Sequence, residues 1–299
     1  MLLPISITKL KMPDHCMGST NTKLADKLKV MQAERSALLA TNFYNYETLR
    51  GVLEAAQNVK LPLILQLTQS SIDYMRLPVA VSMARKALQS FGVEGWIHLD
   101  HAHSYELVSQ CLDAGFDSVM IDASEKSLEE NISITQKVVE LARRYDACVE
   151  AELGYVAKLG QAHNKSGFTE PGEAAYFVKQ TNVDALAVAI GSAHGFYKEE
   201  PKLDLGRLAR IHEATDVPLV LHGSSGIPAG TIGEAVNRGI CKINLATEIK
   251  NIFMLTLKSQ LQNTDEIDLR KVFPPAIRSI TTLVQEKLLI AENKSHRHE

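Results

Sequence analysis

The chain has 299 residues, of which 45% are hydrophobic and 22% are charged, and its formal net charge is −3. This balance is typical of a soluble globular protein with material for one large core or two modest ones. The weak negative charge, without a Lys/Arg stripe interleaved with aromatics, argues against nucleic-acid binding. No apolar run approaches the length of a membrane span, and the N-terminal "MLLPISITKLKM" lacks a clear cleavage site, so neither a membrane anchor nor a signal peptide is expected.

The four cysteines are scattered along the chain and form no CxxC pair: they are Cys16, Cys111, Cys148 and Cys241. Three of them lie in apolar periodic segments, where a free thiol behaves as a small hydrophobic side chain. This usage predicts a reducing compartment, and we expect a cytoplasmic protein.

Short apolar runs alternate with longer helical patterns, and no low-complexity tract or linker divides the chain. An extension over 1–20 precedes a predicted helix at 21–33, and a polar tail follows at 293–299, so we expect one domain over 21–292. The runs interpreted as strands are residues 37–43, 62–68, 95–100, 117–122, 147–153, 184–190, 218–223 and 241–246. The helical patterns that follow them cover 46–58, 79–91, 105–114, 128–145, 171–180, 205–214, 229–237 and 247–261, with one more at 276–289.

Strands that are apolar on both faces, each followed by a helix, indicate a parallel sheet of the α/β class. Eight such units are the number that closes into a (β/α)8 TIM barrel, here with an extra helix at each end. A doubly wound open sheet would usually carry a Gly-rich phosphate loop after its first strand. The sequence "ATNFYN" follows instead, so the barrel is favoured.

Polar residues occur where each predicted strand ends, which is the rim where barrel enzymes build their active sites. Any one of them alone is more often a helix cap or a packing residue. A complete set in register predicts a functional site. The set is Asn42, Thr68, Asp100, His101, Asp122, Glu152, His194, His222 and Asn244.

Three histidines from three predicted strands, His101, His194 and His222, are the ingredients of a catalytic metal site that leaves one position open. Glu152 and Asp122 add carboxylates, either as alternate ligands or at a second position. Zinc is the first expectation, and cobalt or ferrous iron would accept similar ligands.

The stretch "IHLDHAH" (97–103) adds further titratable groups. Asp100 stands beside a predicted ligand and can transfer a proton at the same substrate, or it can orient that ligand. His98 is expected to support the site or to pack in the core, and His103 to be a loop or cap residue.

Glycines and hydroxyls follow the last three predicted strands, where barrel enzymes commonly bind phosphate through loop amides and helix N-termini. The motifs are "AHGFY" (193–197), "HGSSG" (222–226) and "NLATE" (244–248). Gly195, Gly223 and Gly226 permit close backbone approach, while Ser225 and Thr247 offer hydroxyl donors. A phosphorylated substrate is therefore expected.

From about residue 21 to 289 the sequence resembles the class II metal-dependent ketose-bisphosphate aldolases, most closely their tagatose-bisphosphate branch. The matching segments are "HLDHA" (98–102), "MIDASEKSLEENI" (120–132), "VEAELG" (149–154), "AVAIGSAHGFY" (187–197), "LVLHGSSG" (219–226) and "KINLATEIK" (242–250). The resemblance implies zinc on the three histidines, proton transfer by Asp100, and an alternate metal position near Glu152 and Asp122. It also admits a monovalent cation.

The resemblance further implies a binding site for the phosphate of dihydroxyacetone phosphate and for the rest of the substrate. The residues expected around the phosphate are Gly195, Gly223, Ser225, Ala246 and Thr247, with Asn244 near the hydroxyl or carbonyl end. The strand-end residues Asn42 and Thr68 are expected to bind substrate as well. Arg270, in "DLRKVF", matches a basic residue that reaches the second phosphate in a neighbouring subunit, so a homodimer or homotetramer is expected.

One segment departs from the family. The usual Gly-Gly pair and closely following glutamate, which supplies the base for dihydroxyacetone phosphate, are replaced by "ELGYVAKLGQAHNKSGFTEP". No acidic residue stands between Glu152 and Glu170. Gln161 and His163 occupy that neighbourhood, and His163 has a suitable intrinsic pKa for a base. We expect residues 153–170 to form a mobile lid.

The sequence thus predicts a lyase that cleaves a ketose bisphosphate, tagatose- or fructose-1,6-bisphosphate, to dihydroxyacetone phosphate and glyceraldehyde 3-phosphate. The metal replaces a Schiff-base lysine, so neither Lys158 nor Lys242 is needed as a nucleophile. Two alternatives stay open: an aldolase for another phosphorylated sugar or keto-deoxy sugar acid, and a metal- and phosphosugar-binding protein with weak or no turnover.

Overall fold

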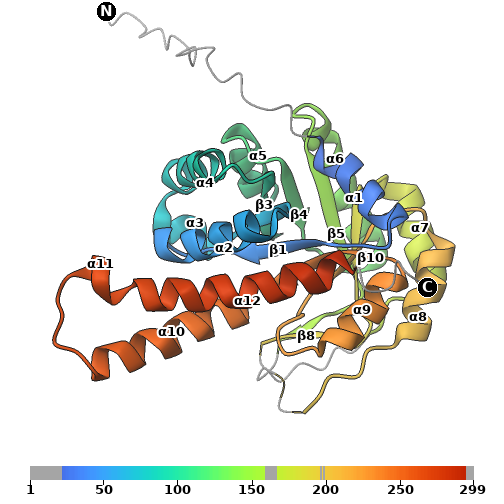
Figure 1. The fold of residues 1–299 in the computed structure, drawn as a ribbon. Coiled ribbons are helices and arrows are strands. Elements are labelled where there is room, and N and C mark those ends of the chain that lie inside the picture. The colour runs from blue at the N-terminus through green and yellow to red at the C-terminus, as the bar shows by residue number, and fades with distance from the viewer. Residues whose placement is uncertain (1–21, 159–166, 196, 198, 294–299) are drawn as a thin grey trace, which may run out of the picture.

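The computed structural model describes residues 22–158, 167–195, 197 and 199–293. Eight parallel strands close into a barrel in the order β1-β10-β9-β7-β5-β4-β3-β2, so the predicted TIM barrel is confirmed (Figure 1). The barrel strands are β1 (Leu38–Asn42), β2 (Leu63–Thr68), β3 (Gly95–Ala102), β4 (Ser118–Ile121), β5 (Cys148–Leu153), β7 (Ala185–Val188), β9 (Leu219–Leu221) and β10 (Ile240–Leu245). The bounds of each strand either fall inside one of the runs expected from the sequence or extend beyond it by at most two residues.

Helices follow the strands around the outside of the barrel, except for α1, which precedes β1, and the helices at the C-terminal end of the chain. The helices are α1 (Leu24–Ala33), α2 (Tyr46–Val59), α3 (Gln69–Met75), α4 (Leu77–Phe91), α5 (Tyr105–Asp113), α6 (Leu128–Arg143), α7 (Pro171–Thr181), α8 (Leu205–Ala214), α9 (Ala229–Asn237), α10 (Thr247–Gln262), α11 (Leu269–Val272) and α12 (Pro274–Glu292). The sequence did not predict α3, α11 or the small sheet formed by β6 (Ala157–Lys158) and β8 (Ala193–His194). These elements are too short for a helical or alternating pattern to stand out.

Capping residues determine where several helices begin. Asn45 and Thr48 form a reciprocal capping box at the start of α2, and Ser127 and Glu130 form another at α6. Each box satisfies two backbone N–H groups that would otherwise have no partner. Both helices therefore start close to the end of the preceding strand.

The barrel interior is apolar at its N-terminal end and polar at its C-terminal end. Leu24, Leu28 and Met31 of α1 close the N-terminal mouth against Trp96 and other inward-facing strand residues. Further along the strands, the inward positions carry buried polar groups. The alternation of side chains along each strand thus directs one row of residues toward a polar rim.

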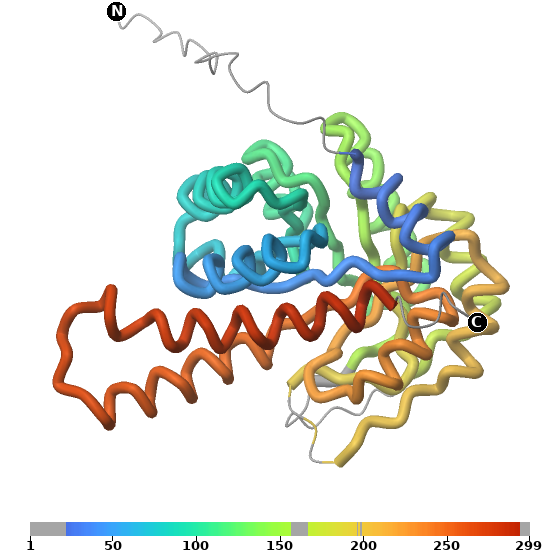
Figure 2. Tube along the Cα trace, in the orientation of Figure 1, coloured from blue at the N-terminus to red at the C-terminus, as the bar shows by residue number. Residues whose placement is uncertain are grey.

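The helices α10, α11 and α12 form an arm that projects from the barrel, as Figures 1 and 2 show. α12 returns alongside α10 and packs against α2. Within the described ranges, no helix combines the length and apolar character required to cross a bilayer.

Candidate active site

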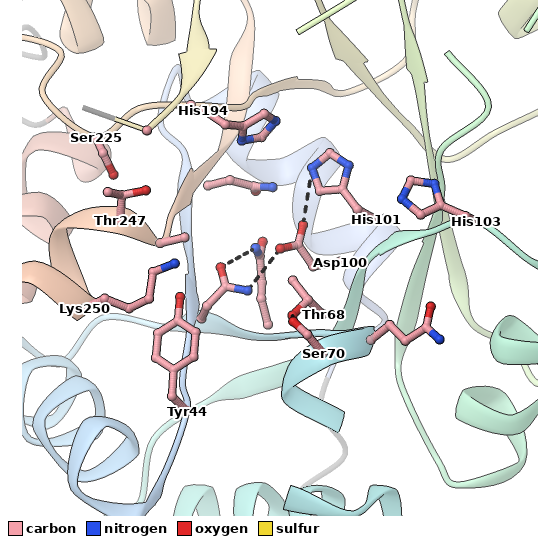
Figure 3. Close-up of a pocket in the computed structure, with 17 residues that line it drawn as sticks. Tyr44, Thr68, Ser70, Asp100, His101, His103, His194, Ser225, Thr247 and Lys250 are labelled. Carbon is pink, nitrogen blue, oxygen red and sulfur yellow. Dashed lines mark hydrogen bonds and ion pairs between the residues drawn. The ribbon is translucent and has the colours of Figure 1, made fainter. Parts of the chain in front are cut away.

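A pocket of about 430 Å³ opens at the C-terminal ends of the barrel strands (Figure 3). Most of the predicted substrate residues line it, together with several residues that the sequence did not single out. The lining residues are Asn42, Tyr44, Gln66, Thr68, Gln69, Ser70, Asp100, His101, His103, His194, Gly195, Gly223, Ser225, Asn244, Ala246, Thr247 and Lys250.

The three predicted metal-ligating histidines converge at one side of this pocket. His101, His194 and His222 offer ligand atoms that all lie within 4.8 Å of one another. Their ring centroids are 4.8 to 5.8 Å apart. His194 reaches the cluster from β8, six residues beyond the end of β7, so it does not stand at the end of a barrel strand as expected.

Buried atoms without hydrogen-bond partners face this cluster. They include His101 Nε2, His222 Nδ1 and Glu152 Oε2. An unpaired buried polar atom is unfavourable unless a ligand satisfies it. Two imidazole nitrogens and a carboxylate oxygen are donors that zinc and similar divalent cations accept, so the residues present fit such an ion.

Asp100 and His101 are adjacent in β3, yet both side chains point into the pocket. In a regular strand, consecutive side chains point to opposite faces. Here the pairing of β3 with β4 shifts register between Leu99 and Ala102, and His101 adopts a left-handed backbone conformation with φ of 54°. This local irregularity, which is costly for a residue other than glycine, places the predicted proton-transfer group beside the predicted ligand.

Asp100 is held at the end of a chain of buried amides. Gln66 Nε2 donates to Asn42 Oδ1 at 3.2 Å, and Asn42 Nδ2 donates to Asp100 Oδ2 at 3.0 Å. The other oxygen, Oδ1, has no hydrogen-bond partner and lies 3.8 Å from His101 Nε2. Burial favours the neutral acid, but His101, His222 and the Asn42 amide outweigh it and lower the pKa of Asp100.

The carboxylates Asp122 and Glu152 lie at different places around the cluster. Asp122 Oδ2 is 3.1 Å from His101 Nδ1, and Oδ1 accepts from the Ser124 hydroxyl at 2.7 Å. Asp122 therefore orients the His101 ring from behind, with Nε2 left facing the cluster. Glu152 Oε2 lies 3.1 Å from His222 Nδ1 and is buried.

His222 is completely buried between two carboxylates. Its Nε2 lies 2.8 Å from Glu150 Oε1, and its Nδ1 faces Glu152. Burial opposes a charge on the imidazole, but the contacts with Glu150 and Glu152 outweigh this effect and raise the pKa of His222 to about 9. Without a metal ion the ring therefore carries two protons at neutral pH.

Two of the expected phosphate-binding residues, Ser225 and Thr247, lie on the side of the pocket opposite His103 (Figure 3). α10 begins there, and its N-cap residue, Ala246, has no side chain that could satisfy the first-turn N–H groups. Ser225 Oγ accepts from the Glu248 amide at 3.3 Å, which fixes the hydroxyl beside this helix end. A helix N-terminus that its own N-cap side chain does not cap, with hydroxyls beside it, is suited to an anion.

Gly223 allows two loops to meet at this phosphate end. Its φ is 67°, and a Cβ there would collide with the Ala193 backbone, 2.6 Å from the carbonyl carbon. The Tyr197 hydroxyl accepts from the Ala193 amide at 2.6 Å and donates to the Gly223 carbonyl at 2.8 Å. Hydrogen bonds through Tyr197 therefore link the loops after β7 and β9.

Comparison with known proteins agrees with this arrangement. The family model described as "Fructose-bisphosphate aldolase class-II" matches residues 22–296. The chain belongs to this family. It is a class II aldolase, a lyase of a metal-dependent family that acts on phosphorylated ketoses, so the predicted enzyme class is confirmed.

Individual relatives cover nearly the whole aldolase chain. The D-tagatose-1,6-bisphosphate aldolase subunit GatY of Klebsiella oxytoca is 38% identical over 270 residues, covering 88% of this chain and 95% of that protein. The crystal structure of the YdjI aldolase from Escherichia coli K12 is 31% identical with a TM-score of 0.81, covering 91% of this chain and 98% of that one. A structure described as a candidate fructose-1,6-bisphosphate aldolase from Coccidioides immitis is 26% identical with a TM-score of 0.83, covering 92% and 97%.

Two charged or titratable pocket residues of the aldolase, Lys250 and His103, were missed or underrated in the sequence. Lys250 lies one turn beyond Thr247 in α10, with its ammonium 5.5 Å from the Tyr44 ring centroid. A lysine one helical turn after the "NLAT" motif could have been recognised as a residue on the same face. His103, expected in a loop or cap, also lines the pocket.

Four predicted residues that the structure describes do not line this pocket: His222, Asp122 and Glu152, which lie around the histidine cluster, and Arg270. Arg270 lies in α11 at the tip of the arm, where its side chain is 90% exposed and pairs with Asp268. His163 and Gln161 lie outside the described residues, as do the other residues of 159–166 in the middle of the predicted lid.

Proposed function

We propose that this aldolase cleaves a ketose 1,6-bisphosphate, either tagatose- or fructose-1,6-bisphosphate, to dihydroxyacetone phosphate and glyceraldehyde 3-phosphate. The observation that carries this proposal is that a cluster of three histidines, a buried aspartate with an unpaired oxygen, and the N-terminus of α10 lie together at the C-terminal end of the barrel. The tagatose-1,6-bisphosphate aldolase subunit among the relatives supports this substrate class.

We propose zinc as the resident ion, held by His101, His194 and His222, with Co²⁺ or Fe²⁺ as substitutes. Glu152, whose unpaired oxygen faces the cluster, is the nearer carboxylate for an alternate position, and Asp122 supports it through His101. A bound divalent cation supplies the positive charge that polarises the ketose carbonyl and stabilises the enediolate left by carbon–carbon cleavage. A monovalent cation beside the phosphate is part of the same proposal.

Asp100 is proposed to move the proton of the hydroxyl that becomes the aldehyde. Asn42 occupies Oδ2, so Oδ1 is the atom that accepts this proton during cleavage and returns it during condensation. The lowered pKa keeps Asp100 ionised at neutral pH, as a base requires. The identity of the base that acts on dihydroxyacetone phosphate is a separate proposal, with His163 as the candidate.

The phosphate of dihydroxyacetone phosphate is proposed to bind at the α10 N-terminus. The residues that would surround it are Gly195, Gly223, Ser225, Ala246 and Thr247, and Lys250 would add a positive charge. Asn244, Asn42 and Thr68 would contact the rest of the sugar. Arg270 would serve the second phosphate in a neighbouring subunit of a homodimer or homotetramer.

The wider proposal is a single domain over residues 21–292, working in the cytoplasm without nucleic acid or a membrane. The match of the family model to residues 22–296 supports the domain limits.

Metal removal tests the function directly. EDTA is expected to abolish cleavage of both bisphosphates, and added zinc to restore it. His222→Ala should lose most bound metal, whereas Asp100→Asn should keep the metal and lose about 10²- to 10⁴-fold in rate. A comparison of kcat/KM for the two bisphosphates then identifies the preferred substrate.

Two results would contradict the proposal. Full activity in protein shown to be free of metal would remove the metal from the reaction. Equal metal loss in His222→Ala and Asp100→Asn would remove the distinction between ligand and proton-transfer residue.

A further inference from the structure

A buried ion pair lies in the barrel interior beneath the pocket and takes no part in the chemistry described above. Lys242 of β10 and Glu150 of β5 are each 1% exposed. Lys242 Nζ donates to Glu150 Oε2 at 2.6 Å. A lysine and a glutamate are almost never fully buried unless they are paired, so this pair needs a physical reason.

The two oxygens of Glu150 serve different partners. Oε2 accepts from Lys242, and Oε1 lies 2.8 Å from His222 Nε2. Lys242 is held from its other side by His98, whose Nε2 is 3.4 Å from the ammonium and whose Nδ1 is 2.8 Å from Ser118 Oγ. The ion pair is thus fixed at both ends by side chains of the barrel interior.

These contacts determine which nitrogen of His222 remains for a metal. An ionised carboxylate can only accept hydrogen bonds, so His222 Nε2 must donate to Glu150. Nδ1 is then the nitrogen that faces the histidine cluster, where it makes no hydrogen bond although Glu152 Oε2 lies 3.1 Å away. His101 has the opposite arrangement, because Asp122 stands at its Nδ1 and leaves Nε2 toward the cluster.

We propose that Glu150 and Lys242 are positioning residues of the metal centre. Glu150 holds the His222 ring so that Nδ1 faces the metal, and Lys242 holds Glu150 in place and balances its charge. This inference rests on the proposed metal site. Such outer carboxylates orient ligating histidines, and their removal typically weakens metal binding 10- to 100-fold.

Folding stability alone does not account for the pair. Replacing a buried ion pair with apolar residues of similar volume is often neutral or stabilising. The neighbouring layer of the interior is already apolar, with Trp96, Cys148 and Cys241 in one cluster. An apolar pair would therefore suit this place if orientation of His222 were not required.

The test uses the full chain with both partners replaced together, Lys242→Met with Glu150→Leu, so that no charge is left unpaired. Zinc affinity is measured by competition with a chelator, and the visible spectrum of the cobalt-substituted protein reports ligand geometry. We expect 10- to 100-fold weaker zinc binding and an altered cobalt spectrum. The thermal midpoint of the metal-free protein should stay equal or rise.

Ser118→Ala is the matched control, because it alters the same buried layer through His98 without touching His222. Its zinc affinity should stay within about twofold of the parent, because the variant loses only one neutral hydrogen bond and that bond is remote from the metal ligands. If the double variant fails to fold, Glu150→Gln keeps the volume, removes the negative charge and replaces one acceptor oxygen with an amide NH2 group, and weakened zinc binding is again expected.

A folded double variant, or a folded Glu150→Gln, with zinc affinity and cobalt spectrum equal to the parent would overturn the positioning role. An equal loss of zinc affinity in Ser118→Ala would overturn it as well, because any change to this buried layer would then weaken zinc binding. If His222→Ala bound zinc as tightly as the parent, the proposed metal site itself would fail, which is a different result.

Discussion

The imidazole of His222 is expected to differ in protonation between the metal-free and the metal-bound protein. Its raised pKa, about 9, means that a proton occupies the ligand nitrogen at neutral pH. A metal ion must displace that proton. At pH values below the pKa of His222, zinc affinity should therefore increase as the pH rises. Above that pKa, zinc affinity should no longer increase with pH.

We predict that zinc affinity rises about tenfold per pH unit between pH 7 and 8 and levels off near pH 9, because His222 releases one proton on binding the metal. His101, whose pKa is also raised, can add to the proton release. Chelator competition at several pH values measures this slope. Calorimetry in buffers of different ionisation enthalpy counts the released protons. An affinity that does not change over this range would show that His222 is already neutral.

A second prediction concerns His163, which lies outside the described residues. If it is the base for dihydroxyacetone phosphate, His163→Ala should slow exchange of solvent deuterium into that substrate, because a neutral Gln161 cannot abstract a proton. Gln161→Glu, which restores a carboxylate, should accelerate exchange. Exchange as fast as in the parent for His163→Ala would exclude the histidine, and no change in either variant would place the base elsewhere.

At the scale of elements, the start of α10 is the feature that recognises phosphate. Ser225→Ala and Thr247→Ala should each raise KM for the phosphorylated ketose, corresponding to about 1–3 kcal/mol for a hydrogen bond to a charged group. Lys250→Met should raise KM similarly, because it removes the positive charge of a lysine that lines this pocket. Steady-state kinetics with the bisphosphate measure all three.

Thr256→Ala is the control for this helix. Thr256 lies on the same helix, but its hydroxyl is 2.9 Å from Ser279 of α12, and it does not line the pocket. Its KM should match the parent. Unchanged KM in Ser225→Ala and Thr247→Ala would place the phosphate in another part of the pocket.

At the scale of the molecule, the projecting arm carries α11, and Arg270 with it, away from the barrel (Figure 1). We predict a dimer or tetramer by sedimentation, in which Arg270 serves a neighbouring active site. Arg270→Ala should raise KM for the bisphosphate but leave deuterium exchange into dihydroxyacetone phosphate unchanged, because that substrate lacks the second phosphate. Lys271→Ala, at the adjacent exposed position, is the control. A fully active monomer would rule out this arrangement.

The sequence by itself determined the order of strands and helices and most of the pocket. Eight apolar runs separated by helical patterns are local features, and hydrophobic burial on both faces of a strand leaves a parallel barrel as the favoured solution. Asn42, Thr68 and Asn244 could be placed at the rim because parallel strands all end on one side. His101, His194 and His222 could be grouped for the same reason.

Only the tertiary structure decided which atoms face one another. Strand alternation alone would send Asp100 and His101 to opposite sides, and a register shift with a left-handed residue brings them together. The pairing of Lys242 with Glu150, 92 positions apart, and the nitrogen that His222 presents follow from barrel closure. Such contacts join residues from distant strands, so they depend on register and packing across the barrel, which no local pattern of residues encodes.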